Sequence, residues 1–248
     1  HVFMPKGSAS SRVKAIEAEG ASVTIVEGSY DEAVEKAADL AGEGVIVLQD
    51  TGYAGYETIP SWIVEGYSTM LWEVEDAWKE EGVQDPTHVF VQIGVGSLAE
   101  ALIRHFRVMG TQPVIVGVEP TGAVCVMEST KAGKVVTLPG HQNSIMAGLN
   151  CGTPSTISFP QLRRGIDCFI SIEDEKAMEA MRLFASAGIT AGETGAAGLG
   201  GLLEIMLPEN YEQRSKLGVG PLARILLLNT EWATDPDSYK RIVGTDPS

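Results

Sequence analysis

The segment from 88 to 118 limits the possible folds more than any other part of the chain. An apolar run, "HVFVQI" (88 to 93), leads through the turn "GVGS" into a stretch with helical periodicity (97 to 109), and a second apolar run, "PVIVGV", covers 113 to 118. Runs that are apolar throughout are typical of strands that helices cover on both faces. The order strand, helix, strand therefore predicts a βαβ unit in a parallel sheet.

The glycine turn between the first strand and its helix contains Gly94, Gly96 and Ser97. Backbone N–H groups exposed at the positive end of a helix favour an anion such as phosphate. The turn lacks the third glycine of a dinucleotide fingerprint and the lysine of a Walker loop. Phosphate binding and a plain tight turn therefore both remain open at this point.

Strand and helix patterns alternate along the rest of the chain. Further strands are predicted at 2 to 4, 22 to 26, 44 to 50 and 224 to 230, and further helices at 10 to 19, 29 to 40, 61 to 81, 174 to 187 and 196 to 206. Ser29 and Glu32 have the spacing of a capping box at the start of one helix. This alternation predicts an α/β fold built from open parallel-sheet layers.

Composition narrows the class of protein. The chain has 33 acidic and 18 basic residues, a net charge of -15, and this balance argues against nucleic acid or an anionic membrane as a partner. No apolar run approaches the roughly 20 residues that span a bilayer. Cys125, Cys151 and Cys168 show no CxxC spacing, which indicates neither a disulfide framework nor a zinc site. We expect a cytoplasmic enzyme acting on a small molecule, with no metal site.

The chain opens inside an apparent strand, "HVFMPKG", without an initiator methionine. Domains seldom begin within a strand. We therefore expect further sequence upstream.

Polar residues at the ends of apolar runs form a second group of candidates. Asp50 ends the predicted strand at 44 to 50, where open α/β sheets place their ligands, although an aspartate there also caps turns. Tyr53 and Tyr56 follow Asp50, and their rings are expected either to line a pocket or to pack against the rest of the protein. Glu193 and Thr194 precede an apolar helix, where they either cap it or meet a cofactor edge.

The histidines carry no ligand spacing. His88 and His105 are expected to be structural, and His141 is kept as a candidate because it lies in a predicted loop.

Together these stretches resemble a specific family. The blocks, in chain order, are "VFMPKGSASSRVKAIEAEGA", "QDTGYAGYETIPSWIVEGY", "GVGSLAEAL", "GVEP", "IMAGLNCGTPSTIS" and "GETGAAGLGGLLE". This order is similar to that of the diaminopropionate ammonia-lyases, which belong to the pyridoxal phosphate enzymes that include threonine dehydratase and the tryptophan synthase β subunit. The resemblance covers nearly the whole chain, and the block that begins at Gln49 is its subfamily-specific part.

The resemblance implies the tryptophan synthase β-like fold and pyridoxal phosphate as cofactor. It implies two domains, with residues 1–52 as the remainder of a small α/β domain and 53–248 as the large cofactor-binding domain. Cofactor contacts are then expected from Gly94, Val95, Gly96, Ser97 and Leu98 around the phosphate, from Thr194 at the pyridine nitrogen, and from Glu193. A neutral hydroxyl at the ring nitrogen favours elimination over transamination.

The same resemblance implies a β-elimination that converts D- and L-2,3-diaminopropionate to pyruvate and ammonia. Asp50 matches an acid of the subfamily that serves as a second base, on the face opposite the lysine. The Schiff-base lysine of the family precedes "VFMPKG", and Lys6, Lys14 and Lys36 lie in no such motif. We therefore expect this chain to be inactive alone, and its protein to be a homodimer acting on an amino acid.

Alternatives remain open from the sequence. Another pyridoxal phosphate lyase, acting on serine, threonine or cysteine, is the nearest. A cofactor-free binding or regulatory module and a nucleotide-binding α/β domain are more distant ones. Related enzymes sometimes bind a cation through the strand-end acid that corresponds to Glu119, for which an ordinary polar strand end is the alternative.

Overall fold

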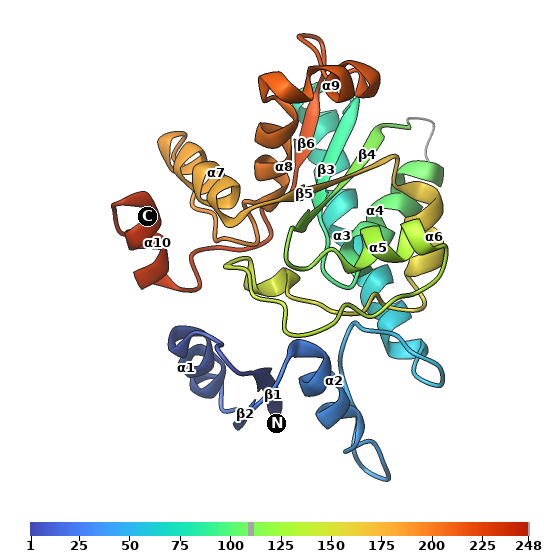
Figure 1. The fold of residues 1–248 in the computed structure, drawn as a ribbon, viewed down its shortest axis with the longest axis vertical. Helices are drawn as coiled ribbons and strands as arrows, with labels where there is room; N and C mark the ends of the chain where they lie inside the picture. Colours follow the sequence, from blue (N-terminus) through green and yellow to red (C-terminus); the bar gives the residue numbers. More distant parts are fainter. Residues whose placement is uncertain (109–111, 248) are drawn as a thin grey trace.

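The computed structural model describes residues 1–108 and 112–247. They contain a two-stranded sheet, β1-β2, and a four-stranded sheet with the order β5-β4-β3-β6. In Figure 1 the small sheet and its helices lie at the lower end of the molecule, and the larger sheet lies above them. We call residues 1–40 the N-terminal unit.

The N-terminal unit alternates strands and helices as the sequence predicts. Its elements are β1 (Val2–Pro5), α1 (Ser10–Ala18), β2 (Val23–Val26) and α2 (Tyr30–Ala38), and the two strands pair in parallel. The capping box is confirmed, since Ser29 N donates to Glu32 Oε2 at 2.7 Å and Glu32 N donates to Ser29 Oγ at 3.3 Å. These bonds satisfy N–H groups that the first turn of α2 cannot pair internally.

The larger sheet confirms the predicted parallel layer. It consists of β3 (His88–Gln92), β4 (Val114–Pro120), β5 (Cys168–Ile172) and β6 (Ile225–Leu227), and all neighbouring pairs are parallel. Every residue of β3 is buried, with Val89 and Val91 in one core cluster and Phe90 in another. The apolar run thus supplies two cores because successive side chains of a strand point to opposite faces.

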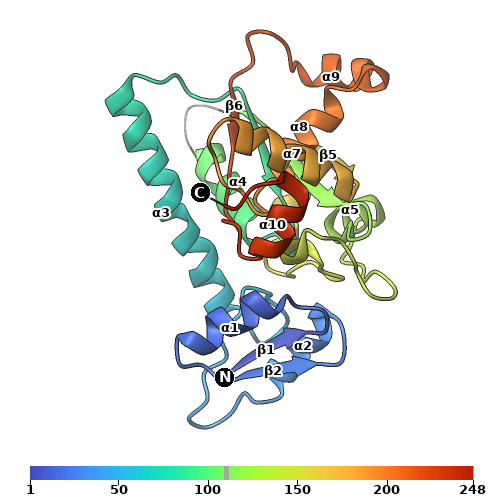
Figure 2. The same cartoon turned by 90° about the vertical axis from the view of Figure 1, so that its left-hand side faces the viewer.

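Helices cover both faces of this sheet. Their bounds are α3 (Thr58–Glu81), α4 (Ser97–Val108), α5 (Cys125–Ala132), α6 (Phe159–Gly165), α7 (Asp174–Ser186), α8 (Ala197–Ile205), α9 (Tyr211–Leu217) and α10 (Pro236–Val243), with short 3₁₀ turns at Ala147–Leu149 and Pro208–Asn210. α3 to α6 pack against the face that carries Val89, and α7 and α8 pack against the face of Phe90. Figure 2 shows α3 running the length of the molecule, from the N-terminal unit past the larger sheet.

The predicted strand at 44 to 50 is wrong. The segment forms only an isolated bridge between Gly42 and Val45, and Ile46 and Leu48 are 79% and 76% exposed. Among the described residues no strand pairs with this segment, so the apolar run forms no ladder of backbone hydrogen bonds.

The sequence prediction also missed β5, α5, α6, α9 and α10. β5 is only partly buried and lacks a clear alternation of apolar and polar residues. The domain division after residue 52 stays a prediction. Within the described residues, no helix combines the length and the apolar character needed to cross a membrane.

Candidate active site

A cavity of about 270 Å³ lies at the carboxyl ends of β3 and β6, between the larger sheet and the N-terminal unit. Its walls come from several parts of the chain that are far apart in sequence. They comprise Tyr30; Asp50 and Tyr67; Gln92 with residues 94–99; Gly148, Leu149 and Cys151; and Thr194 with Thr230. Open α/β sheets place their ligands at this edge.

The glycine turn forms one wall of the cavity. Gly96 has a φ of +105°, and a Cβ added there would overlap Leu162, a buried side chain. A Cβ at Gly94 would lie 3.0 Å from the carbonyl oxygen of Gly148 and 3.2 Å from Cys151 Sγ. Only glycine combines this backbone conformation with such a close approach.

The turn leads directly into α4, whose first N–H groups have no partner within the helix. Residues 95 to 99 line the cavity, so the positive end of the helix faces it. A narrow cradle of glycines beside free N–H groups fits a phosphate group. The residues present are therefore compatible with a phosphorylated cofactor.

Asp50 lies beside this turn. Its carboxylate oxygen Oδ1 accepts a hydrogen bond from the Tyr30 hydroxyl at 3.3 Å, and its carbonyl oxygen accepts one from Ser97 Oγ at 3.1 Å. Burial raises the pKa of the Asp50 carboxyl, and the backbone N–H of Asp50, followed by the hydroxyls of Tyr30 and Ser97, partly opposes that shift. A carboxylate with a raised pKa is a stronger base than an exposed aspartate.

The segment that carries Asp50 is fixed to the glycine turn by hydrogen bonds of its neighbours. Gly52 N donates to Ser155 Oγ at 2.9 Å, and Ser155 N donates to Val95 O at 3.0 Å. Tyr56 donates to Val47 O at 2.7 Å and stacks on Tyr53 with ring centroids 5.2 Å apart. Both tyrosines lie outside the cavity wall, so they pack the segment before and after Asp50.

Two threonine hydroxyls reach the cavity. Thr194 Oγ1 accepts a hydrogen bond from Gly148 N at 3.1 Å, and Thr230 Oγ1 accepts one from Gln92 Nε2 at 2.7 Å. In each case the hydroxyl oxygen already accepts a bond, so its own proton can serve a ligand acceptor. The Oε1 atom of Gln92 is buried and has no hydrogen-bond partner among the described residues.

Glu193 takes a different position from its neighbour Thr194. Its side chain is buried outside the cavity wall, where Oε1 accepts a bond from Ser238 Oγ at 2.6 Å and Oε2 lies 3.6 Å from Arg12 Nη2. Consecutive residues at a helix start point in different directions, and Ser238 and Arg12 hold the Glu193 side chain away from the cavity. This placement gives no support to a direct contact between Glu193 and the cofactor.

The sequence reasoning did not select several of the residues in the wall. They are Tyr30, Tyr67, Gln92, Gly148 and Thr230. Gln92 ends β3 and Thr230 follows β6, so the rule that ligands bind at the carboxyl ends of parallel strands could have found both. The two tyrosines lie on helices and carry no such signal.

Other polar candidates lie away from the cavity. His141 is exposed, and no lysine is among the described residues that form the wall. The carboxylate of Glu119 accepts bonds from Val126 N and Met127 N, both at 2.9 Å, and thereby caps α5. Burial raises the pKa of Glu119 to about 8.

The three cysteines are free, and no group of three or more His, Cys, Asp or Glu side chains within residues 1–108 and 112–247 is arranged to hold a metal ion. Cys151 forms part of the cavity wall, and burial raises the pKa of its thiol well above the usual range.

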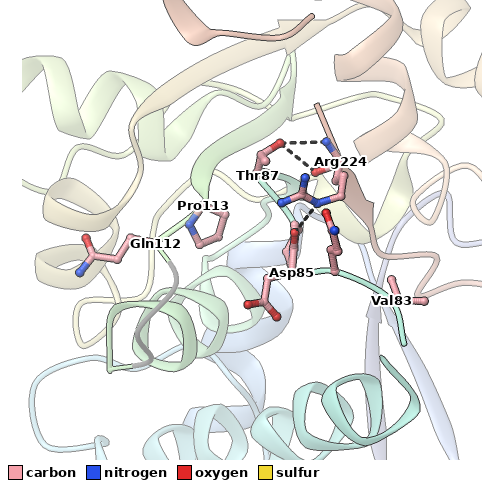
Figure 3. Close-up of a pocket in the computed structure, with 8 residues that line it drawn as sticks. Val83, Asp85, Thr87, Gln112, Pro113 and Arg224 are labelled. Carbon is pink, nitrogen blue, oxygen red and sulfur yellow. Dashed lines mark hydrogen bonds between the residues drawn. The ribbon is translucent and has the colours of Figure 1, made fainter. Parts of the chain in front are cut away.

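A wider and shallower hollow of about 540 Å³ lies at the opposite edge of the sheet. Figure 3 shows Arg224 beside Thr87 and Asp85, and its Nε donates to the carbonyl oxygen of Asp85 at 2.7 Å. This hollow lies at the amino ends of the strands and holds none of the residues predicted from sequence. We therefore assign the site to the smaller cavity.

Comparison with known proteins identifies the family to which the chain belongs. The sequence model of the family described as "Pyridoxal-phosphate dependent enzyme" matches residues 1–230. The diaminopropionate ammonia-lyase of Salmonella typhimurium is 39% identical over 254 residues, covering 98% of this chain and 63% of the relative. The Escherichia coli enzyme of the same name is 36% identical over 253 residues, with the same coverage of both chains.

Solved structures agree with the sequence matches. A crystal structure of diaminopropionate ammonia lyase from Escherichia coli, in complex with an aminoacrylate-PLP azomethine reaction intermediate, superposes with a TM-score of 0.87 at 34% identity, covering 97% of this chain and 63% of that one. A complex of that enzyme with D-serine gives 0.85 at 34% identity, covering 97% and 62%. The chain thus spans about 63% of the length of the curated relatives it matches.

Proposed function

The chain belongs to the family of pyridoxal-phosphate dependent enzymes, and we propose that its protein catalyses the β-elimination of 2,3-diaminopropionate to pyruvate and ammonia. The tryptophan synthase β-like fold expected from the sequence is confirmed, as is the similarity to diaminopropionate ammonia-lyases. The observation that carries the proposal is the meeting of Asp50, the glycine turn and Thr194 around one cavity.

Pyridoxal phosphate, when bound, supplies an electron sink for the charge that develops at the substrate α-carbon. In the proposal, residues 94 to 98 hold its phosphate through backbone N–H groups at the start of α4. The hydroxyl of Thr194 would donate to the ring nitrogen, and the Thr230 hydroxyl lies in the same cavity. A hydroxyl partner leaves the ring nitrogen neutral, which favours expulsion of a β-substituent over transamination.

Asp50 is proposed as the base that removes the α-proton of the D-isomer. Its raised pKa strengthens it as a base, and the bond from Tyr30 orients one carboxylate oxygen. Loss of ammonia from the β-carbon follows, and hydrolysis of the enamine product gives pyruvate and a second ammonia. The protein is further proposed to be a cytoplasmic homodimer whose partner is a free amino acid.

A second base on the other face would serve the L-isomer. The matched relatives are longer than the aligned region, and no lysine lies in the cavity wall among the described residues. We propose that the second base is a lysine from outside residues 1–248. Residues 1–248 alone are then proposed to have no lyase activity.

The test uses protein expressed from the complete gene, with pyruvate release from D- and L-diaminopropionate as the readout. Asp50→Asn should lower kcat/KM for the D-isomer by roughly 100-fold or more, the range for loss of a positioned base, and should affect the L-isomer far less. The acid limb of the pH profile for the D-isomer should disappear with it. Asp76→Asn, at an exposed position on α3, is the control. Equal loss for both isomers, or faster turnover of serine or threonine than of diaminopropionate, would contradict the proposal.

A further inference from the structure

A mostly buried ionic cluster links the N-terminal unit to the turn that carries Thr194. Arg12, on α1, donates from Nη2 to Glu231 Oε1 at 3.0 Å and from Nε to Thr234 Oγ1 at 2.9 Å. The same Nη2 lies 3.6 Å from Glu193 Oε2. The side chains of Arg12, Glu193 and Glu231 are 19%, 5% and 15% exposed, so one guanidinium compensates two carboxylates away from most solvent. Partners of this kind depend on one another strongly.

Glu231 connects this cluster to the cavity. Its second carboxylate oxygen, Oε2, accepts a hydrogen bond from the backbone N–H of Thr194 at 2.8 Å. The carbonyl oxygen of Glu231 accepts a further bond from Gly192 N at 2.8 Å. Both bonds fix the backbone on either side of Glu193, and the Thr194 hydroxyl projects from that backbone into the cavity.

The close packing of this turn leaves it little freedom. A Cβ at Gly192 would lie 2.6 Å from the carbonyl oxygen of Trp232, and a Cβ at Gly195 would lie 2.8 Å from that of Glu231. The backbone from 192 to 195 therefore rests directly on residues 231 and 232. A displacement of the Glu231 side chain is transmitted to Thr194 without intervening flexible groups.

A second contact of the N-terminal unit does not reach Thr194. Asp31, on α2, accepts bonds from Thr153 Oγ1 at 2.6 Å and from Gly152 N at 3.2 Å. It therefore attaches the same unit to another loop. Of these two contacts, only the one through Arg12 leads to Thr194, because Arg12 binds Glu231 and Glu231 binds the backbone N–H of Thr194.

We propose that Glu231 is a positioning residue for Thr194, and that Arg12 holds Glu231 in place when the N-terminal unit is seated over the cavity. Seating of the unit and orientation of the Thr194 hydroxyl are then one coupled event. The inference rests on the proposed function only in requiring that Thr194 contacts the bound cofactor.

A double-mutant cycle on the full-length protein tests this coupling. The variants are Arg12→Ala, Glu231→Ala and the double variant, and the readouts are cofactor fluorescence, the dissociation constant of pyridoxal phosphate, and kcat separately from KM. Each single variant should shift the fluorescence maximum and lower kcat roughly tenfold, and the double variant should be no worse than either single one. Arg12→Lys, which keeps the charge, should recover part of the loss.

Controls separate positioning from simple stabilisation. Glu212→Gln breaks an exposed ion pair with Lys216 on α9 and should leave every readout unchanged. Additive effects of Arg12→Ala and Glu231→Ala, or lower thermal stability with an unaltered cofactor spectrum, would overturn the inference. If the wild-type protein binds pyridoxal phosphate but lacks lyase activity, the proposed function fails, and the fluorescence cycle still decides the coupling.

Discussion

Two apolar runs differ in structure: one forms β3 in the four-stranded sheet, and the other, at 44 to 50, forms no strand. The apolar run of β3 lies at the centre of its sheet, where all of its residues are buried. The apolar run at 44 to 50, just beyond the N-terminal unit, forms no strand, and Ile46 and Leu48 are mostly exposed. The difference teaches that an apolar run reports a preference for extended backbone, whereas a neighbouring strand decides whether a sheet forms.

The largest expected effect comes from core truncation in the two sheets. Phe90, on β3, is 0% exposed and Ile25, on β2, is 41% exposed. Phe90→Ala should lower the free energy of unfolding by about 3–5 kcal/mol, and Ile25→Ala by less than about 1 kcal/mol. Urea denaturation measures both. Similar losses at the two positions would contradict the predicted difference between the two sheets.

Two glycines with positive φ sharpen the comparison further. Gly96 (φ +105°) faces Leu162, whereas a Cβ added at Gly20 (φ +87°), after α1, would meet no described atom within 4 Å. Gly20→Ala should cost about 1–2 kcal/mol from backbone conformation alone. Gly96→Ala should cost about 2–4 kcal/mol, because overlap adds to that strain, and should weaken pyridoxal phosphate binding in a fluorescence titration. Tight cofactor binding by Gly96→Ala would contradict the assigned phosphate cradle.

Strand-end glutamates give a contrast that depends on pH. Glu119 is fully buried at the end of β4, and burial raises its pKa from an ordinary value of 4.5 to about 8. The unfolded chain therefore loses this proton at lower pH than the folded chain does. The stability linked to Glu119 is complete below about pH 4.5 and is lost as pH rises towards 8, with a slope of up to about 1.4 kcal/mol per pH unit.

Glu119→Gln should remove that slope from unfolding measurements made between roughly pH 5 and roughly pH 9, a window that spans the raised pKa. Glu27, which follows β2 and forms an exposed ion pair with Lys6, is the matched position in the N-terminal unit. Glu27→Gln should keep the slope of the wild-type protein. An unchanged slope in Glu119→Gln would mean that another group titrates there.

Local sequence signals predicted much of the fold. The βαβ unit around the glycine turn, the capping box of Ser29 and Glu32, and the long helix that became α3 all depend on residues close together in the chain. The prediction failed at 44 to 50 and missed β5, because a strand is completed by pairing partners that no local pattern specifies.

Motifs likewise identified only part of the candidate site. Asp50, the turn at 94 to 98 and Thr194 were identified by motif, and the structure places all of them around one cavity. Glu193, next to Thr194, belongs to the ionic cluster with Arg12 instead. A motif fixes the order of residues in the chain, but the direction of each side chain depends on the partners packed around it.

The sequence by itself determined the parallel α/β layer, the glycine turn before α4 and the family, because these follow from short-range periodicity and from contiguous motifs. Only the tertiary structure decided that Tyr30, Gln92 and Thr230 complete the cavity wall and that Glu231 supports Thr194. These contacts join segments brought together by the order of the strands and the seating of the N-terminal unit. Their energies depend on distance in space, which the spacing of residues along the chain does not encode.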